Sequence, residues 1–198
     1  MSLLTKIAEP IRNYRANQIL KHIRFFLESG ESMLSVGDGD GYVSLRIQEK
    51  TGVEIQGLDI LAYPKYRVPG VPLVLYDGNE PIPFPDNSFD VCIGVFVLHH
   101  CPNVNNILEE MIRVSRKKLI IVEDVFTNRL EHYFLKFFDL LENRTFSAQM
   151  PIPFNFRKLD DWKELFKNFD LWLVHSSQFH ALPLPVRNQS FCMYLKNS

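Results

Sequence analysis

MLSVGDGDGYVSLRIQEK, residues 33–50, contains the pattern on which the interpretation of this chain depends. A short apolar run at 33–36 leads into GDGDG, and a helical pattern follows at 42–50. Glycine adopts backbone angles closed to other residues, and it lets a ligand approach the main chain without meeting a Cβ atom. The stretch therefore predicts a buried strand, a glycine loop that can hold a ligand, and a helix that Gly52 ends.

The loop differs from the common phosphate-binding glycine motifs. The dinucleotide fingerprint GxGxxG needs glycine at position 42, where Tyr42 stands, and the residues after the loop lack the GK ending of a P-loop. Asp38 and Asp40 would repel a pyrophosphate but not a sulfonium cation. A plain flexible turn and a calcium loop are the alternatives, and an EF-hand would need further carboxylates and a closing Glu.

Strand and helix patterns alternate along most of the chain. Strand patterns occur at 53–59, 71–77, 89–98 and 118–125, and the clearest helix pattern between them is at 104–116. Such alternation predicts parallel βαβ units, hence an α/β fold with a doubly wound, Rossmann-like sheet and helices on both faces. Further helices are predicted at 129–143 and 159–169, and two terminal strands are predicted within 170–182 and 190–197.

We interpret residues 1–198 as a single domain with three parts. These parts are an N-terminal helix at 11–29, a ligand-binding half at 33–127 and an insert at about 128–158. The connection at 61–72 should contain no helix longer than one turn, because Pro64, Pro69 and Pro72 each remove a donor and clash with the preceding turn.

Composition narrows the class of protein. Lys and Arg number 22 against 23 Asp and Glu, which gives no support for binding nucleic acid or an anionic membrane. No apolar run approaches the roughly 18 residues of a membrane span, and the N-terminus lacks a signal-peptide core. The cysteines are Cys92, Cys101 and Cys192, an odd number without framework spacing, so reduced thiols are expected. We therefore expect a cytoplasmic protein.

Two acidic residues end successive strand patterns. Asp59 ends 53–59, and Asp77 ends 71–77 and is followed by Gly78. Ligands of open α/β sheets bind at the carboxyl ends of the strands, and a carboxylate there can accept two hydrogen bonds from a ribose diol. Asp77 could accept from an adenine amino group, and the N–H of Gly78 could reach a ring nitrogen. Because no helix follows Asp59 to be capped, we expect its role to be met only by ligand, so that Asp59→Ala leaves folding nearly intact.

The glycine loop, the strand-end acids and the segments that follow them resemble those of a known family. Four segments are similar, in their order and spacing, to the class I S-adenosylmethionine-dependent methyltransferases, in the small type 11 branch. These segments are MLSVGDGDG (33–41), IQGLDI (55–60), LYDGNEPIPFPDNSFDVCIGVFVLHHCP (75–102) and ILEEMIRVSRKKLIIVEDV (107–125). The resemblance covers about residues 15–127 and implies a seven-stranded, mostly parallel sheet with the last strand antiparallel. It implies S-adenosylmethionine as cofactor, S-adenosylhomocysteine as product, and cofactor contacts at Gly37, Asp38, Gly39, Gly41, Asp59, Asp77, Gly78, Gly94, Val95 and Phe96. We further expect Ile60, Leu61 or Tyr63, in the connection after the second strand, to cover one face of the adenine.

The chain departs from the family pattern in three places. Ser35 stands where the family usually has an acidic residue, two positions before the first glycine. The helix that commonly joins the second and third strands is replaced by the proline-broken 61–72. The usual PGG turn before the fifth strand is replaced by SRKK at 115–118. The first departure bears on cofactor affinity, and the others bear on the connections.

Methyl transfer requires the acceptor atom to lie in line with the methyl group, and a base only if the acceptor must lose a proton. No catalytic residue is therefore obligatory. His99, His100 and His180 are candidates for a general base, and the alternative is that they pack or cap a helix. A zinc site built from His99, His100 and Cys101 lacks the usual ligand spacing, so no metal site is expected.

The acceptor is not specified by the sequence. Aromatic residues at Tyr133, Phe134, Phe137, Phe138, Phe146, Phe154 and Phe156 fit either a core or a lid over an acceptor pocket, and 151–155 is the preferred lid segment. We expect a small-molecule acceptor and no nucleic acid. The alternatives are an RNA or protein methyltransferase, and a protein that keeps the fold and binds the cofactor without catalysis. The oligomeric state is not indicated.

Overall fold

The computed structural model describes residues 3–63, 65–146, 152–182 and 186–196. Its strands are β1 (Ser32–Val36), β2 (Glu54–Asp59), β3 (Leu73–Leu75), β4 (Phe89–Val95), β5 (Ser115–Val125), β6 (Leu171–Phe179) and β7 (Arg187–Leu195). Its helices are α1 (Leu3–Ile23), α2 (Tyr42–Thr51), α3 (Val104–Val114), α4 (Arg129–Phe146) and α5 (Leu159–Lys167), with short 3-10 turns η1 (Arg24–Phe26) and η2 (Leu98–His100).

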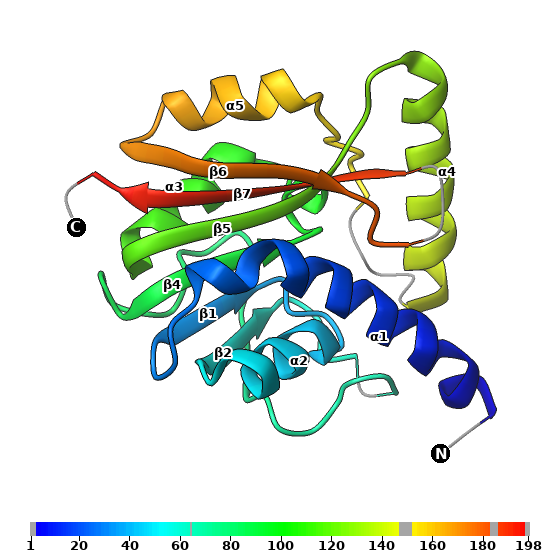
Figure 1. Cartoon of the computed structure of the whole chain (residues 1–198), viewed down its shortest axis with the longest axis horizontal. Helices are drawn as coiled ribbons and strands as arrows, with labels where there is room; N and C mark the ends of the chain where they lie inside the picture. The colour runs from blue at the N-terminus through cyan, green and yellow to red at the C-terminus, as the bar shows by residue number, and fades with distance from the viewer. Residues whose placement is uncertain (1–2, 64, 147–151, 183–185, 197–198) are drawn as a thin grey trace.

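The strands form one seven-stranded sheet in the order β3-β2-β1-β4-β5-β7-β6. The first five strands pair in parallel, whereas β7 is antiparallel to both β5 and β6. The sequence prediction of a doubly wound, mostly parallel sheet with an antiparallel last strand is therefore confirmed. In Figure 1, α1 and α2 lie on one side of the sheet, α3 and α5 lie on the other, and α4 stands at one end.

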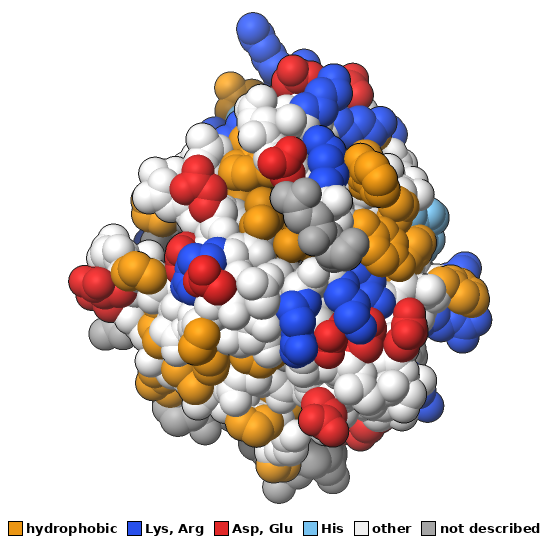
Figure 2. All heavy atoms as spheres, turned by 90° about the vertical axis from the view of Figure 1, so that its left-hand side faces the viewer, with side chains coloured by type: hydrophobic (Ala, Val, Ile, Leu, Met, Phe, Trp, Pro, Cys, Tyr) orange, Lys and Arg blue, Asp and Glu red, His pale blue; other side chains and the backbone are white. Residues whose placement is uncertain are grey.

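The surface carries charges of both signs. On the face shown in Figure 2, Lys and Arg side chains are interspersed with Asp and Glu, as the balanced composition leads one to expect. Among the residues that the structure describes, none of the helices combines the length and the apolar character needed to cross a bilayer.

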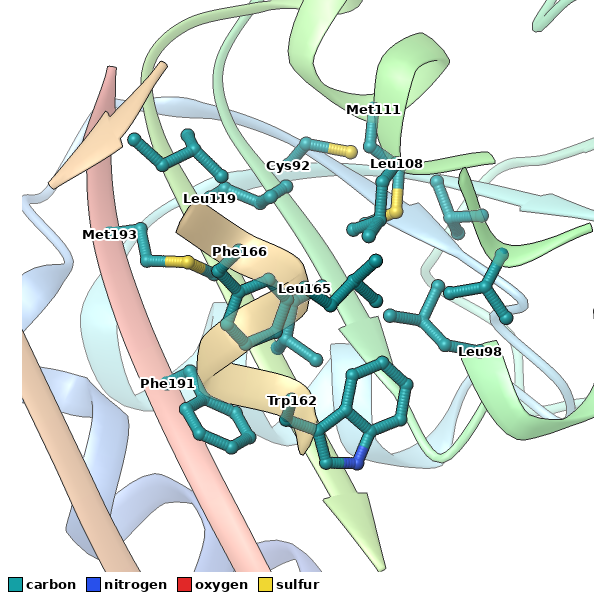
Figure 3. Close-up of a cluster of buried hydrophobic side chains, with 14 of the residues drawn as sticks. Cys92, Leu98, Leu108, Met111, Leu119, Trp162, Leu165, Phe166, Phe191 and Met193 are labelled. Carbon is teal, nitrogen blue, oxygen red and sulfur yellow. The ribbon is translucent and has the colours of Figure 1, made fainter. Parts of the chain in front are cut away.

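Two hydrophobic cores hold the sheet between its helices. β5 contributes side chains to both cores, because successive residues of a strand face opposite sides of the sheet. Leu119 and Ile121 pack with α3 and α5, whereas Ile120 and Val122 pack with α1 and α2. Figure 3 shows the first core, in which Trp162, Leu165 and Phe166 of α5 gather with strand side chains such as Phe191. A strand buried on both faces reads as a continuous apolar run, which explains why 118–125 is a clear pattern in the sequence.

Several predicted boundaries are wrong. The N-terminal helix is α1 at 3–23 rather than 11–29, because the helix continues through Pro10 and ends at Ile23, where η1 follows. A proline removes one helical hydrogen bond, and here it does not end the helix. β3 is only Leu73–Leu75, so Asp77 lies beyond the strand and not at its end.

Other elements differ from the prediction by smaller amounts. β5 begins at Ser115, before the predicted start, and α4 continues to Phe146. The described part of 61–72 contains no helix, as predicted, and Pro64 lies outside the described residues. Residues 147–151, part of the predicted insert and including Pro151 of the predicted lid segment, also lie outside them.

The core around α5 provides a stability test with an internal control. Trp162 is 0% exposed, whereas Trp172 on β6 is 61% exposed. Trp162→Ala should lower the free energy of unfolding by about 3–5 kcal/mol, because it removes a buried aromatic ring and leaves a cavity. Trp172→Ala should change it by about 0.5 kcal/mol or less. Urea unfolding followed by circular dichroism measures both, and equal losses would contradict the described packing.

Candidate active site

The glycine loop begins directly after β1 and is held against the end of β2. The N–H groups of Gly37 and Asp38 both donate to the carbonyl oxygen of Leu58, at 2.8 and 3.1 Å. Gly37 has a φ of 66° and faces Val97, with which a Cβ atom would overlap. Both the positive φ and the lack of space require glycine here. GDGDG thus lies between β1 and α2, as the sequence predicts.

A buried ion pair supports the loop from below. Nη1 of Arg67 lies 2.7 Å from Oδ2 of Asp38, and these side chains are 14% and 1% exposed. The Ser44 hydroxyl donates to the other oxygen of Asp38. The same guanidinium donates to the carbonyl oxygens of Gly39 and Val71, both at 3.0 Å. The carboxylate of Asp38 therefore stabilises the loop, a role that sequence reasoning did not assign to it.

Asp59 joins the loop to the end of β2. Its Oδ2 accepts from the N–H of Gly39 at 2.8 Å, and its Oδ1 accepts from the N–H of Leu61 at 2.9 Å. Burial raises the pKa of Asp59, although the backbone N–H groups oppose the shift. The expectation that Asp59 has no partner without ligand is therefore wrong. Each carboxylate oxygen carries a second lone pair, so two acceptor positions are not used by these bonds.

Helix α1 contacts the loop through an arginine that sequence reasoning missed. Nη2 of Arg12 lies 2.8 Å from Oδ2 of Asp40, and its guanidinium lies 4.3 Å from the ring centre of Tyr42. Burial raises the pKa of Asp40, and the hydrogen bond from the N–H of Tyr42 and the positive charge of Arg12 oppose this rise. Arg15, one helical turn further along α1, lies over the ring of Phe96 at 4.6 Å. The helix thus forms one wall of the space above the loop.

That space is a pocket of about 1250 Å³ at the carboxyl ends of the parallel strands. The predicted cofactor residues that line it are Gly37, Asp38, Gly39, Asp59, Ile60, Gly78, Val95 and Phe96. Lining residues that sequence reasoning did not assign to the site include Arg12, Arg15, Tyr42, Tyr76, Asn79, Asn103, Asn106 and Asn143. The sequence offers no local signal for the α1 and α4 members of this set, because they lie far along the chain from the glycine loop.

The remaining predicted cofactor residues lie outside the pocket lining. Gly41 is the N-cap of α2, and a Cβ atom there would come within 3.1 Å of the Arg67 guanidinium. Oδ1 of Asp77 accepts from the backbone N–H and the side-chain amide of Asn79, at 3.0 and 2.9 Å. Gly94 is packed in the core, where a Cβ atom would meet Val97 at 3.0 Å.

The turn after β4 is fixed by a buried carboxylate from β5. Oε1 of Glu123 accepts from the N–H groups of Val97 and Leu98, at 3.1 and 2.7 Å. Oε2 of Glu123 lies 2.6 Å from Nδ1 of His99, whose ring stacks on Phe156 at 4.5 Å. Burial opposes the charged form of His99, but the charge of Glu123 outweighs it and raises the pKa of His99 to about 10.

The three candidate histidines differ in position. His99 and His100 belong to η2, but only His100 lines the large pocket. His99 and His100 both line a second cavity of about 90 Å³ beneath α4. His180 is exposed, lines neither cavity, and lies with Nδ1 2.7 Å from the carbonyl oxygen of Val186. His180 is therefore not brought to the site.

Tyr133, Phe134, Phe137 and Phe138 of α4 are not buried in the core. Tyr133 is 70% and Phe137 is 61% exposed, whereas Phe156, further along the chain, is buried against His99. Among the described residues of the predicted insert, only Asn143 lines the large pocket. Asn155 fixes the nearby chain, because its side-chain amide donates to the carbonyl oxygen of Cys101 at 2.7 Å. Whether the segment acts as a lid stays a prediction.

Comparison with known proteins agrees with this geometry. Residues 34–122 match the family model described as a methyltransferase domain. A demethylmenaquinone methyltransferase from Tropheryma whipplei is 32% identical over 102 residues, 48% of this chain and 42% of that protein. A phthiotriol/phenolphthiotriol dimycocerosates methyltransferase from Mycobacterium tuberculosis is 34% identical over 94 residues, 44% of this chain and 34% of that protein. The chain thus spans less than half the length of these curated relatives.

Solved structures share the fold over nearly the whole chain. A SAM dependent methyltransferase from Aquifex aeolicus superposes with a TM-score of 0.66 at 17% identity, covering 96% of this chain and 95% of that one. A putative methyltransferase from Haloferax volcanii, solved with the Trm112 methyltransferase activator, gives 0.64 at 13% identity, with 91% and 96% covered. Residues 34–122 are therefore similar to a methyltransferase domain, and the solved methyltransferase structures share the fold of this chain.

The ion pair beneath the loop provides a further test. Arg67→Ala leaves the buried carboxylate of Asp38 without its cation, and it should lower the free energy of unfolding by about 3–5 kcal/mol. Arg46→Ala is the matched control, because Arg46 pairs with Glu49 at the surface of α2 and should cost about 0–1 kcal/mol. Urea unfolding of both variants gives the comparison. A loss for Arg67→Ala as small as that of the control would show that the ion pair does not support the loop.

Proposed function

We propose that the chain catalyses methyl transfer from S-adenosylmethionine to a small-molecule acceptor. The observation that carries the proposal is one pocket in which the glycine loop, Asp59 and the turn after β4 meet at the carboxyl ends of β1, β2 and β4. Ligands of open α/β sheets bind at this edge. The pocket of about 1250 Å³ is large enough to take a cofactor and a second molecule together.

The residues present fit this cofactor. The unused lone pairs of Asp59 can accept the hydroxyls of a ribose. The base would lie between Ile60 and the Gly78–Asn79 turn, and the amino-acid portion would lie against the glycine loop. The order β3-β2-β1-β4 then directs the sulfonium end toward Phe96 and Val97, which follow β4. The carboxylates of Asp40 and Asp59 favour a cationic ligand here.

When bound, the cofactor supplies the electrophilic methyl group, and the protein orients the acceptor and excludes water. Residues beyond β4 and on the neighbouring elements form the wall where an acceptor would lie: Tyr76, His100, Cys101, Asn103, Asn106, Ile107 and Asn143. The mixture of amide, phenol and apolar groups suits a small molecule with polar and apolar parts. The names of the Tropheryma and Mycobacterium relatives, which denote methyltransferases of a quinone and of lipids, support this class of acceptor.

Ligand binding tests the cofactor assignment. Asp59→Asn should weaken S-adenosylhomocysteine binding by about 1.5–3 kcal/mol, because it removes a charged acceptor of hydrogen bonds. Asp59→Asn should also lower the stability of the free protein, since the carboxylate holds Gly39 and Leu61. The ligand-induced rise in melting temperature is therefore compared with the ligand-free value of the same variant. Asp86→Asn, at an exposed residue outside the pocket, is the control.

Wild type and Asp86→Asn should show the same ligand-induced rise, and Asp59→Asn should show much less. Equal rises in all three proteins would remove the ribose assignment. A screen of candidate acceptors with isotope-labelled S-adenosylmethionine then tests transfer. Binding without transfer to any acceptor would identify a catalytically silent protein, and labelling of RNA or protein would contradict the proposed acceptor class.

A further inference from the structure

A second polar centre lies behind the turn after β4, separate from the cofactor contacts. Nε2 of His99 and Nε2 of His100 lie 3.3 and 3.4 Å from the same atom, Oδ1 of Asp139 on α4. The three ligand-type atoms all lie within 4.8 Å of one another. The sequence hides this cluster, because Asp139 is 40 residues from His99. Sequence reasoning considered Cys101 as the third ligand, and the fold brings Asp139 there instead.

Nδ1, the other ring nitrogen of His99, already has a hydrogen-bond partner. Its Nδ1 lies 2.6 Å from Oε2 of Glu123, a buried carboxylate that can only accept. Nδ1 therefore carries a proton, and a metal ion that displaces the proton from Nε2 would meet a lone pair directed toward Asp139. A ligating histidine that donates its other N–H to a carboxylate is the usual arrangement in metal sites, because it fixes the tautomer and the ring orientation.

Asp139 has capacity that the described structure does not use. Its side chain is 8% exposed. Its Oδ1 accepts from the amide of Asn143 at 2.6 Å, while its Oδ2 is buried without a hydrogen-bond partner among the described residues. A buried carboxylate oxygen without a partner costs free energy, and a cation bound by the Asp139 carboxylate would offset that cost. Two buried carboxylates, Glu123 and Asp139, thus flank the ring of His99 and favour positive charge.

Two of the three distances within the cluster fit a small tetrahedral site, and the third, between the two ring nitrogens, is no more than 4.8 Å. Zn²⁺ bonds of about 2.0–2.1 Å place the ligand atoms of a tetrahedron about 3.3–3.4 Å apart. The two N–O separations in the cluster, 3.3 and 3.4 Å, match this value. The cavity of about 90 Å³ that the three residues line has room for a water molecule as a fourth ligand.

We propose that His99, His100 and Asp139 form a binding site for a divalent transition-metal ion, for which Zn²⁺ has the matching ligand preference and geometry. His100 and Asn143 line both the small cavity and the large pocket, so a bound ion would lie beside the space assigned to the acceptor. The site does not depend on the proposed cofactor. The alternative for the same geometry is a protonated His99 held between Glu123 and Asp139 without metal.

The test uses the whole chain freed of metal with a chelator and titrated with Zn²⁺ by calorimetry. Wild type should bind one ion per chain, and Asp139→Asn should bind at least about tenfold more weakly, since even the partners of ligands contribute about 10–100-fold. His132→Gln is the matched control, because His132 is also on α4 but stacks on Phe126 and lines neither cavity. It should bind Zn²⁺ as wild type does. Circular dichroism establishes that the variants are folded.

A second measurement uses only the wild-type protein, so its result does not depend on whether the variants fold. X-ray absorption at the zinc edge should show imidazole nitrogen and oxygen ligands and no sulfur. The proposal is overturned if wild type binds no Zn²⁺, if Asp139→Asn binds it as tightly as wild type, or if the ion is held by thiolates such as that of Cys101.

Discussion

The carboxylate of Asp59 is the link on which the pocket depends. It ends β2, lies almost fully buried, and holds the N–H groups of Gly39 and Leu61. A charged group in this position must be hydrogen-bonded, and the backbone of the loop and of the segment after β2 provides the donors. Hydrogen bonds to the Asp59 carboxylate and to the carbonyl oxygen of Leu58 in turn hold the glycine loop in shape, so the strand end and the loop fix one another. Arg67 supports the same loop from below through Asp38. A cofactor would therefore meet a loop that is already in place.

The turn after β4 is organised by the same principle. Glu123 is a buried carboxylate on β5 that holds two backbone N–H groups of the turn and one ring of the His99–His100 pair. On one side of this turn, Phe96 and Val97 line the large pocket, and on the other side His99 faces the small cavity. The carboxyl edge of the sheet thus carries two polar centres that share one wall, and residues of α1 and α4 line the cavities around them.

Much of the fold follows from local pattern, and much of the site does not. The glycine loop, α2 with its Gly52 cap and the buried β5 are predicted because glycine conformation and apolar periodicity are local properties. Asp59 is found for the same reason, since it stands at a strand end. The pairs Arg67–Asp38 and His99–Asp139 cannot be read from the sequence, because their members meet only after the chain folds. The end of α1 and the length of β3 differ from the prediction because tertiary packing overrides local propensity.

The central claim is that Asp59 and the glycine loop form a preorganised binding site for S-adenosylmethionine. A crystal structure of the chain with S-adenosylhomocysteine measures this most directly. The account predicts both ribose hydroxyls within hydrogen-bond distance of the Asp59 carboxylate, with the bonds from Gly39 and Leu61 retained and the sulfur directed toward Phe96 and Val97. Ligand bound elsewhere, or a ribose that makes no contact with Asp59, would contradict it.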